Sequence, residues 1–585
     1  MRGVMKCAWK PLALACSLVI GIYAYMTQSG LLELLSPSAA ETPYNLLVQG
    51  FREGHLSLAK EVPAEFIHLA DPYDPTANDL YRVPPHRMLD LSYYKGRLYL
   101  YFGITPALIL FWPFVALTGH YLFQRQAVAI FCSLGFLASA GLLRAIWRRY
   151  FAEIRVGVLT AGMLALGLAT GVPALLSEAD VYQVPISCGY MLTMLALVAI
   201  WCALHEPERS CRWLALASVV YGLAVGARPN LLFGAVILLV PVAQAWHERR
   251  QIGALLIAAT GPIVLIGLGL LLYNALRFDN PFEFGMHYAL AGERQVTRQL
   301  FSLHYLWFNF RVFFLEPARW STLSPYIREA AVPLLPAGYA QVRNPYGILT
   351  NIPLVWMALA VPLAWRSQPG QAALILRWFV TAVALLFGAC ALTIGLFWSA
   401  SFRYEVDFLP ALILLAVVGI LGLEHALAGR LVWRRAARWG WGLMLGFSVA
   451  FNLLASVEHY AEAHSNLGTI LLRKGHVREA VSQFEQALRI DPDYNEALIN
   501  LGSTLLQMGQ VQEAIARYEQ AVRIHPGSPE AYNNLGVALA HLGRVQEAIE
   551  NWRQALRINP GYADARRNLE IALGQTGNPK DAGNR

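Results

Sequence analysis

Acidic side chains follow the first apolar run of this chain. Glu41, Asp71, Asp74 and Asp90 lie in the polar stretch 28–97. A carboxylate can take the proton of an attacking hydroxyl group, and positive charge or a metal ion can stabilise a departing anion. The four acids are therefore candidate bases or metal ligands for a group-transfer reaction at a membrane surface.

Arginines elsewhere in the chain are the candidate cationic partners of these acids. Arg228 lies in GLAVGARPN, Arg277 in YNALRFDNPFEFG, and Arg403 precedes Tyr404 in SFRYEVDFLPALILLA. An arginine between apolar runs is costly unless it meets an anion or lines a water-filled cavity. We therefore predict that Arg228, Arg403 and Tyr404 contact a phosphate.

Structural roles compete with the catalytic roles of the acids. Asp71-Pro72 and Asp74-Pro75 are typical of turns, because Asp bonds nearby backbone and Pro fixes φ. Asp90 precedes an aromatic segment and is equally consistent with a helix N-cap. The tyrosines at 93, 94, 99 and 101 are typical of an interfacial aromatic belt.

The composition indicates a protein with many membrane-spanning helices. Of 585 residues, 56% are hydrophobic and only 14% are charged, and the mean hydropathy is +0.42. The net charge of +8 comes from short basic clusters beside apolar runs, as membrane topology requires, and it does not indicate a nucleic-acid partner. The seven cysteines show no disulfide or zinc spacing, so no metal site is predicted from them.

Residues 1–456 alternate apolar segments with polar connections. The first apolar run follows Lys6 and Lys10, and Ser38-Ala39-Ala40 after it also fits a signal-peptidase site. Because the run leads a chain with many apolar segments, we predict an uncleaved helix that starts in the cytoplasm. Later segments near the ~20 residues that span a bilayer lie at 98–118, 124–146, 156–175, 186–204, 213–246, 252–273, 347–365, 374–398, 407–424 and 439–456. We predict an all-α, polytopic membrane domain of about 11–13 helices with external loops at 28–97 and 274–346.

After Ser456, three landmarks repeat every 34 residues. NLG begins at 466, 500 and 534, EA begins at 479, 513 and 547, and a proline follows at 492, 526 and 560. The pattern resembles tetratricopeptide repeats, in which helix pairs stack into an α-solenoid. It predicts a repeat domain at 457–575 and a disordered tail at 576–585.

The basic loop 425–438 predicts which side of the membrane holds the repeats. Its arginines place this loop in the cytoplasm, so the last span delivers the repeats to the outside. That arrangement needs an odd number of crossings, and we assign the incomplete crossing to 213–246. The predicted location is the bacterial inner (cytoplasmic) membrane, with the loops and repeats on the periplasmic side.

The order of motifs in 1–456 resembles the GT-C superfamily of membrane glycosyltransferases. ETPYNLLVQGFREGHL (41–56) and LDLSYYKGRLYLYFGITPAL (89–108) resemble the start and end of the first external loop of that family. The resemblance implies that a sugar moves from a polyprenyl-phosphate donor, held in membrane lipid, to an acceptor hydroxyl on the external face. It implies that Glu41 and Asp90 are the catalytic carboxylates, although the family usually carries Asp or Asp-Glu at the position of Glu41. A divalent metal can assist such a reaction, and no other cofactor is implied.

Asn466, Asn500 and Asn534 recur in the first helix of each repeat. They resemble the asparagine ladder of the O-linked N-acetylglucosamine transferases, which implies peptide binding and hence a protein acceptor or partner. An amide offers a donor and an acceptor together, as a peptide unit does. Alternatively, each Asn bridges neighbouring helices within the stack.

Two other function classes fit parts of the chain. A polysaccharide polymerase or ligase can also combine many helices with repeats, but its main external loop usually lies late in the chain. A non-enzymatic membrane scaffold that displays tetratricopeptide repeats needs only one helix as an anchor. The early, carboxylate-rich loop favours the glycosyltransferase.

Overall fold

The computed structural model describes residues 2–27, 38–82, 86–291, 299–321, 324, 326–328, 332–343, 345–366 and 368–576. The chain divides into two compact units: a membrane unit (Met1–Ser321 and Tyr326–Ser456) and a repeat unit (Thr322–Pro325 and Val457–Arg585). Helices dominate both units, and strands form only three two-stranded sheets within the described residues. The all-α prediction is therefore confirmed. The predicted tail lies, beyond residue 576, outside the described residues.

Among the described residues, eight helical segments have the length and hydropathy of a membrane span. They are Gln124–Tyr150 (α6), Gln183–His205 (α9), Pro207–Ala227 (η5 and α10), Pro229–His247 (η6 and α11), Gly253–Phe278 (α12), Gly370–Gly395 (α16), Leu409–Ala426 (α17) and Leu431–Arg473 (α18). Four further apolar helices in the described residues are shorter: Lys10–Met26 of α1 (Arg2–Met26), Ala107–Thr118 (η4 and α5), Val156–Leu168 (α7) and Pro353–Arg366 (η10 and α15).

The segment 213–246, where we predicted the incomplete crossing, contains two segments of span length. α10 ends at Ala227, and a second segment with the length and hydropathy of a span starts at Pro229. Proline interrupts the backbone hydrogen bonds of a helix but leaves the apolar pattern in place. Ala107–Thr118, Val156–Leu168 and Pro353–Arg366 are shorter than a span, so the place of the incomplete crossing stays a prediction.

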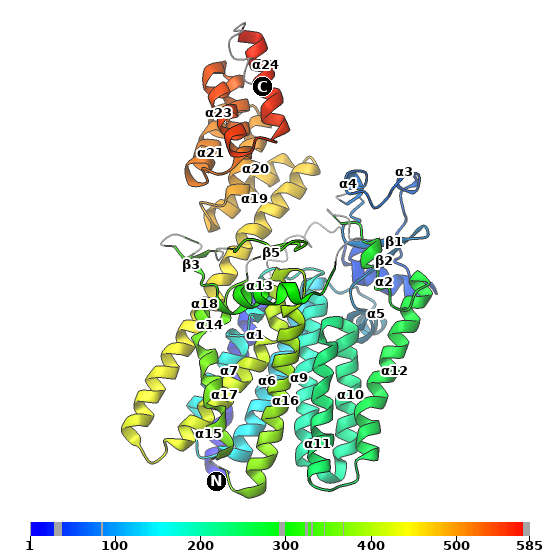
Figure 1. Ribbon diagram of the computed structural model, residues 1–585, viewed down its shortest axis with the longest axis vertical. Helices are drawn as coiled ribbons and strands as arrows, with labels where there is room; N and C mark the ends of the chain where they lie inside the picture. The colour runs from blue at the N-terminus through cyan, green and yellow to red at the C-terminus, as the bar shows by residue number, and fades with distance from the viewer. Residues whose placement is uncertain are drawn as a thin grey trace. The chain divides into compact units, whose positions relative to one another are not determined.

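The connections of the membrane unit gather at two opposite ends of its helical bundle. Figure 1 shows α2 (Pro43–Arg52), α4 (Asp79–Arg82), the strands β1 and β2, and α13 (Leu306–Phe310) at one end, which we call the loop end. The N-terminus lies at the other end of the bundle. The last residues of α6 and α9 meet, because Tyr150 Oη is 2.7 Å from His205 Nε2. Buried Glu424 belongs to this second end and pairs with Arg434 and Arg438 at 2.8 and 2.7 Å. The predicted acids belong to the loop end.

Two distant parts of the chain are joined at the loop end. β1 (Leu91–Tyr94) and β2 (Arg97–Leu100) form an antiparallel hairpin. Asp90 N donates to Leu290 O at 3.0 Å, and Leu290 N donates to Leu91 O at 2.9 Å. Ser92 Oγ donates to Gly285 O at 2.8 Å. Residues 285–290 of the second predicted external loop therefore pack on the start of the hairpin, which ends the first.

Buried amides hold the loop end to the helices below it. Asn45 Nδ2 donates to the carbonyls of Ala39 and Leu122 at 2.7 and 2.8 Å. Asn309 Nδ2 donates to the carbonyl of Gly395 at 3.0 Å. Because both amides are fully buried, losing such a bond would leave a carbonyl unsatisfied at a cost of about 1–3 kcal/mol.

The repeat unit is a series of antiparallel helix pairs that begins with the last part of α18. Its other helices are α19 (Val477–Ile490), α20 (Asn495–Gln507), α21 (Val511–Ile524), α22 (Pro529–His541), α23 (Val545–Ile558) and α24 (Ala563–Thr576). In each pair, a glycine of the first helix faces an aromatic ring of the second. A Cβ added at Gly502 would lie 2.7 Å from Tyr518, and one at Gly536 would lie 2.6 Å from Trp552. The period of 34 residues therefore repeats one packing contact.

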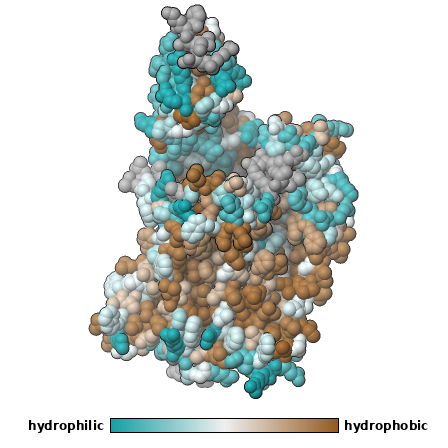
Figure 2. Space-filling model, in the orientation of Figure 1, coloured by the Kyte–Doolittle hydropathy of each residue, from teal (hydrophilic) through white to brown (hydrophobic). Residues whose placement is uncertain are grey.

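Surface hydropathy separates the middle of the membrane unit from its ends. Figure 2 shows hydrophobic side chains over the sides of the helical bundle and more polar ones at the turns between helices. α12 illustrates the pattern, because only 11% of its most apolar window is buried inside the protein, and Ile257, Leu265 and Leu272 are exposed. An exposed apolar helix of this kind is suited to contact lipid.

Candidate functional site

Asp90 lies half-buried immediately before the β1–β2 hairpin. Its φ of 56° is a left-handed conformation that Asp tolerates better than most residues, and because a strand follows, Asp90 is not a helix N-cap. Its Oδ2 accepts a short hydrogen bond from Tyr182 Oη. Burial raises the pKa of Asp90 to about 6, although the charge of Arg403 opposes this rise. A carboxylate with this pKa is suited to accept a proton near neutral pH.

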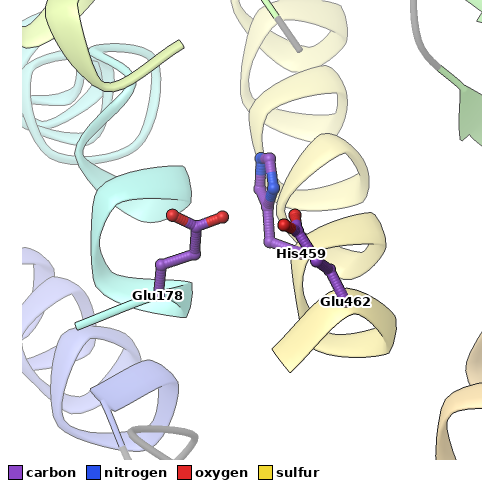
Figure 3. Close-up of side chains that lie close together, drawn as sticks. All are labelled: Glu178, His459 and Glu462. Atoms are coloured by element: carbon purple, nitrogen blue, oxygen red, sulfur yellow. The ribbon is translucent and has the colours of Figure 1, made fainter. Parts of the chain in front are cut away.

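The segment between α8 (Val172–Ser177) and α9 supplies groups that the sequence analysis did not select. Tyr182 precedes α9, and its ring packs edge-on against Phe102 with 5.4 Å between centroids. Asp180 accepts a hydrogen bond from the next backbone amide at 2.6 Å, and burial raises its pKa. Glu178 follows the end of α8 (Figure 3) and pairs with Arg343 at 3.4 Å. The sequence could have indicated these residues, because SEADVYQVP places two acidic residues between two apolar segments.

Arg403 lies half-buried on the 3-10 helix η11 (Phe402–Asp407). Its guanidinium carbon is 4.8 Å from the ring centroid of Tyr182 and 5.6 Å from that of Tyr404. Tyrosine rings attract a cation but do not neutralise it. Within the part of the chain that the structure describes, no carboxylate lies at ion-pair distance from Arg403. The charge of Glu178 acts on Arg403, and Tyr404 is hydrogen-bonded to it, but no ion pair engages its guanidinium in the described residues.

The other two candidate arginines are engaged by the protein itself. Arg228 forms an ion pair with buried Asp407, and its guanidinium carbon lies 5.4 Å from the ring centroid of Tyr404. Arg277 donates to a backbone carbonyl at 2.8 Å and to a side-chain amide at 2.7 Å. Arg228 thus lies beside Tyr404 and compensates a buried acid, whereas Arg403 has no such partner.

A close backbone contact brings the hairpin to the end of α10. A Cβ at Gly103 would lie only 2.2 Å from the carbonyl oxygen of Ala227, so a larger residue does not fit there. Tyr44 Oη donates to the carbonyl of Gly103 at 3.3 Å. Because Arg228 follows Ala227, this contact places the exit of the hairpin beside the Arg228–Asp407 pair.

The structure gives the remaining predicted acids different surroundings. Glu41 is exposed at the end of η3 (Ala39–Glu41), where its charge acts on Lys60. Asp71 and Asp74 accept backbone hydrogen bonds from the residues two positions later at 3.0 and 2.9 Å, as Asp does in turns. No contact between described side chains links Glu41, Asp71 or Asp74 to Asp90. The prediction that Glu41 and Asp90 share one cavity stays a prediction.

The membrane unit by itself does not gather a metal-ligand set. Within its described residues, no three His, Cys, Asp or Glu side chains lie close enough together to hold one ion.

The first helices of the repeat unit carry the recurring asparagines half-buried. Asn500 Nδ2 lies 3.4 Å from Thr469 Oγ1 of the preceding first helix, and Asn534 Oδ1 accepts from Asn533 at 3.1 Å. Asn466 lies on α18, after His459 and Glu462, which Figure 3 shows on the same helix. The contact of Asn500 supports the bridging alternative at that position, and peptide binding stays a prediction.

A family model for the tetratricopeptide repeat matches residues 465–529 and 499–563. The C-terminal repeats are tetratricopeptide repeats. These repeats account for the shared 34-residue spacing of the glycines, alanines and prolines described above.

Three solved structures are similar to about a fifth of the chain. The first TPR of Spaghetti (RPAP3) bound to HSP90 peptide SRMEEVD has 19% identity and a TM-score of 0.20, and the match covers 20% of this chain and 94% of that chain. The structure of MamA has 25% identity and a TM-score of 0.19, and the match covers 20% of this chain and 68% of that chain. The Sgt2 TPR domain from Aspergillus fumigatus has 22% identity and a TM-score of 0.20, and the match covers 20% of this chain and 78% of that chain. No curated protein matches the chain.

Proposed function

We propose that the membrane unit is a GT-C-type glycosyltransferase that uses a polyprenyl-phosphate sugar. The observation that carries this proposal is that Tyr182 contacts both Asp90 and Arg403 at the loop end, which brings a proton acceptor and a cation to one place. A proton acceptor and an anion-binding group are the two requirements of glycosyl transfer from a phosphate. The order of motifs along residues 1–456 adds the resemblance to the GT-C superfamily.

In the proposed reaction, the acceptor hydroxyl attacks the anomeric carbon of the donor sugar. Asp90 takes the proton of that hydroxyl as the new carbon–oxygen bond forms. The bond between the anomeric carbon and the phosphate oxygen breaks, and its electron pair leaves with the phosphate. Arg403, with Tyr404 beside it, stabilises the released polyprenyl phosphate. Arg228 supports this group by compensating Asp407.

The position of this cluster favours a lipid-linked donor. It lies where the loops meet the ends of apolar helices, so a phosphate at the membrane surface can reach Arg403 while its prenyl chain remains in lipid. A polymerase or ligase remains the alternative enzyme, and a membrane scaffold remains the alternative without catalysis.

The loop end and the repeats are proposed to face the periplasm of a bacterial inner membrane. Support comes from the basic residues at the opposite end of the bundle, such as Arg434 and Arg438 beside Glu424. A reporter enzyme that works only in the periplasm should be active when it is fused after Arg585. A well-expressed but inactive fusion would reverse the proposed orientation.

The repeats are proposed to bind a protein acceptor or a protein partner. Their type supports this role, because α-solenoids present extended surfaces for binding, and the RPAP3 domain named above was solved with a bound peptide. Asn466, Asn500 and Asn534 are the proposed peptide contacts. A protein held by the repeats would then be available to the membrane enzyme.

A donor panel tests the enzymatic proposal. The purified full chain is incubated in detergent with undecaprenyl-phosphate glucose, mannose or galactose, with water as the acceptor of the sugar, and release of undecaprenyl phosphate is followed by thin-layer chromatography. Turnover of one donor by the wild type but not by Asp90→Asn is the expected result. If no donor is consumed while the protein remains folded, the scaffold alternative gains.

A further inference from the structure

Tyr182 connects the two groups to which the proposed reaction assigns its chemistry. Its hydroxyl donates to Asp90 Oδ2, and its ring centroid lies 4.8 Å from the guanidinium carbon of Arg403. One rigid aromatic side chain therefore spans the gap between the proton acceptor and the cation.

The surroundings of Tyr182 restrict its motion. It directly precedes α9, whose first turn is buried, and Phe102 packs edge-on against its ring at 5.4 Å. Phe102 in turn lies 4.3 Å from Tyr101, at the exit of the hairpin that begins with Asp90. The ring is thus held by the same loop that carries the acid.

We propose that Tyr182 is a positioning residue, which orients the Asp90 carboxylate through its hydroxyl and holds the Arg403 guanidinium on its ring. This inference rests on the proposed glycosyltransferase function and deepens it. It separates two tasks within one side chain: the hydroxyl serves the proton-transfer step, and the ring serves binding of the donor phosphate.

Two substitutions separate these tasks. Tyr182→Phe removes only the hydroxyl, so the KM for the undecaprenyl-phosphate sugar should stay within twofold, while kcat at high pH falls about tenfold because the carboxylate loses its orientation. Tyr182→Leu also removes the ring, so the KM for that donor should rise about tenfold, as expected for loss of a partly desolvated cation–π contact.

The pH profile distinguishes positioning from a merely structural role. A hydrogen bond donated to a carboxylate favours its ionised form, so Tyr182→Phe should move the acid limb of kcat/KM upward by about one pH unit. Replacing Tyr182 by 3-fluorotyrosine strengthens the donor without changing the shape, and should move the limb downward. The charged and titratable groups around Asp90 that stay unchanged in these variants are Arg403, Asp180, Arg82 and Tyr101.

Tyr94 offers a matched control. Its hydroxyl donates to the exposed carboxylate of Asp279 at 2.9 Å, so Tyr94→Phe removes the same kind of bond outside the cluster. This variant should keep the wild-type kcat, KM and acid limb. Melting temperature and gel filtration of all variants identify any that fail to fold.

The outcomes distinguish failure of the positioning role of Tyr182 from failure of the proposed glycosyltransferase function. If the wild type transfers sugar but Tyr182→Phe and the fluorotyrosine protein keep its acid limb and kcat, the positioning role is wrong while the proposed function stands. If the fluorotyrosine protein alone can be obtained folded, an acid limb that does not move downward overturns the inference. If the wild type consumes no donor, both proposals fall.

Discussion

The cluster of the membrane unit and the repeat unit are built in opposite ways. Asp90, Tyr182 and Arg403 come from three segments that lie far apart in the sequence, and each occurs once. In the repeats, one glycine–aromatic contact recurs at Gly468, Gly502 and Gly536. No other residue can replace a residue that occurs once in such a cluster. In a repeat array, by contrast, the free energy of folding is distributed over contacts between neighbouring repeats. Substitutions should therefore affect activity in the first region and local stability in the second.

The largest effect is expected from Asp90. Asp90→Asn should lower the transfer rate by about 10³-fold, because a general base contributes on the order of 10²–10⁴, while the folded protein is retained. Glu41→Gln is the matched variant, since Glu41 is exposed and has no contact with Asp90. Equal losses of donor turnover in both variants would show that Glu41 and Asp90 act together, although no contact joins them in the structure.

Arg403 and Arg228 should separate activity from stability. Arg403→Gln should lower kcat/KM for the donor about 100-fold with little change in melting temperature. Arg228→Gln leaves Asp407 buried without its ion-pair partner, so the free energy of unfolding should fall by about 3 kcal/mol. Detergent-solubilised melting curves and donor kinetics measure both. An Arg228→Gln protein that is stable but inactive would instead indicate that Arg228 contacts the donor phosphate directly.

The pH dependence of the wild type follows from Asp90. Since burial raises the pKa of Asp90 to about 6, the proposed base would be lost by protonation below that pH. We expect kcat/KM to fall about tenfold per pH unit below pH 6 and to level off above it. An acid limb centred near pH 4, the ordinary range of Asp, would contradict the burial of this carboxyl group.

Gly502 tests the shared stability of the repeats. Gly502→Ala adds a methyl group 2.7 Å from Tyr518, which should cost about 1–3 kcal/mol of local stability. Hydrogen exchange of α20 and α21 in the full chain should accelerate, with donor hydrolysis unchanged. Gly574→Ala in α24 has no neighbour within 4 Å and should leave exchange the same or slower.

The smallest effect is expected from the asparagines. Replacing Asn466, Asn500 and Asn534 together by Ala should weaken binding of extended peptides about tenfold, and equally for unrelated sequences, because an amide reads the backbone. Fluorescence anisotropy with three labelled peptides measures this. Faster hydrogen exchange with unchanged peptide affinity would show that these residues bridge helices, as the contact of Asn500 with Thr469 suggests.

The sequence was most informative where the structure depends on local pattern. Apolar segments of span length predicted the helices of the membrane unit, and the 34-residue period predicted the repeats. Both follow from chain geometry, because a helix that lies in lipid or stacks on its neighbour must show its apolar face at regular spacing. Proline was a weaker guide, since Arg228-Pro229 separates two segments that each have the length of a span.

The cluster at the loop end was decided by tertiary structure. Sequence order selected Asp90, Arg403 and Tyr404, but it also selected Glu41, Asp71 and Asp74, which have other surroundings, and it did not select Tyr182 or Asp180. Composition cannot show that Gly103 meets Ala227, or that Asp407 compensates Arg228 and leaves Arg403 without an ion pair. Such pairings depend on which distant segments pack together, and a charge becomes available to a ligand only when that packing leaves it without a partner in the protein.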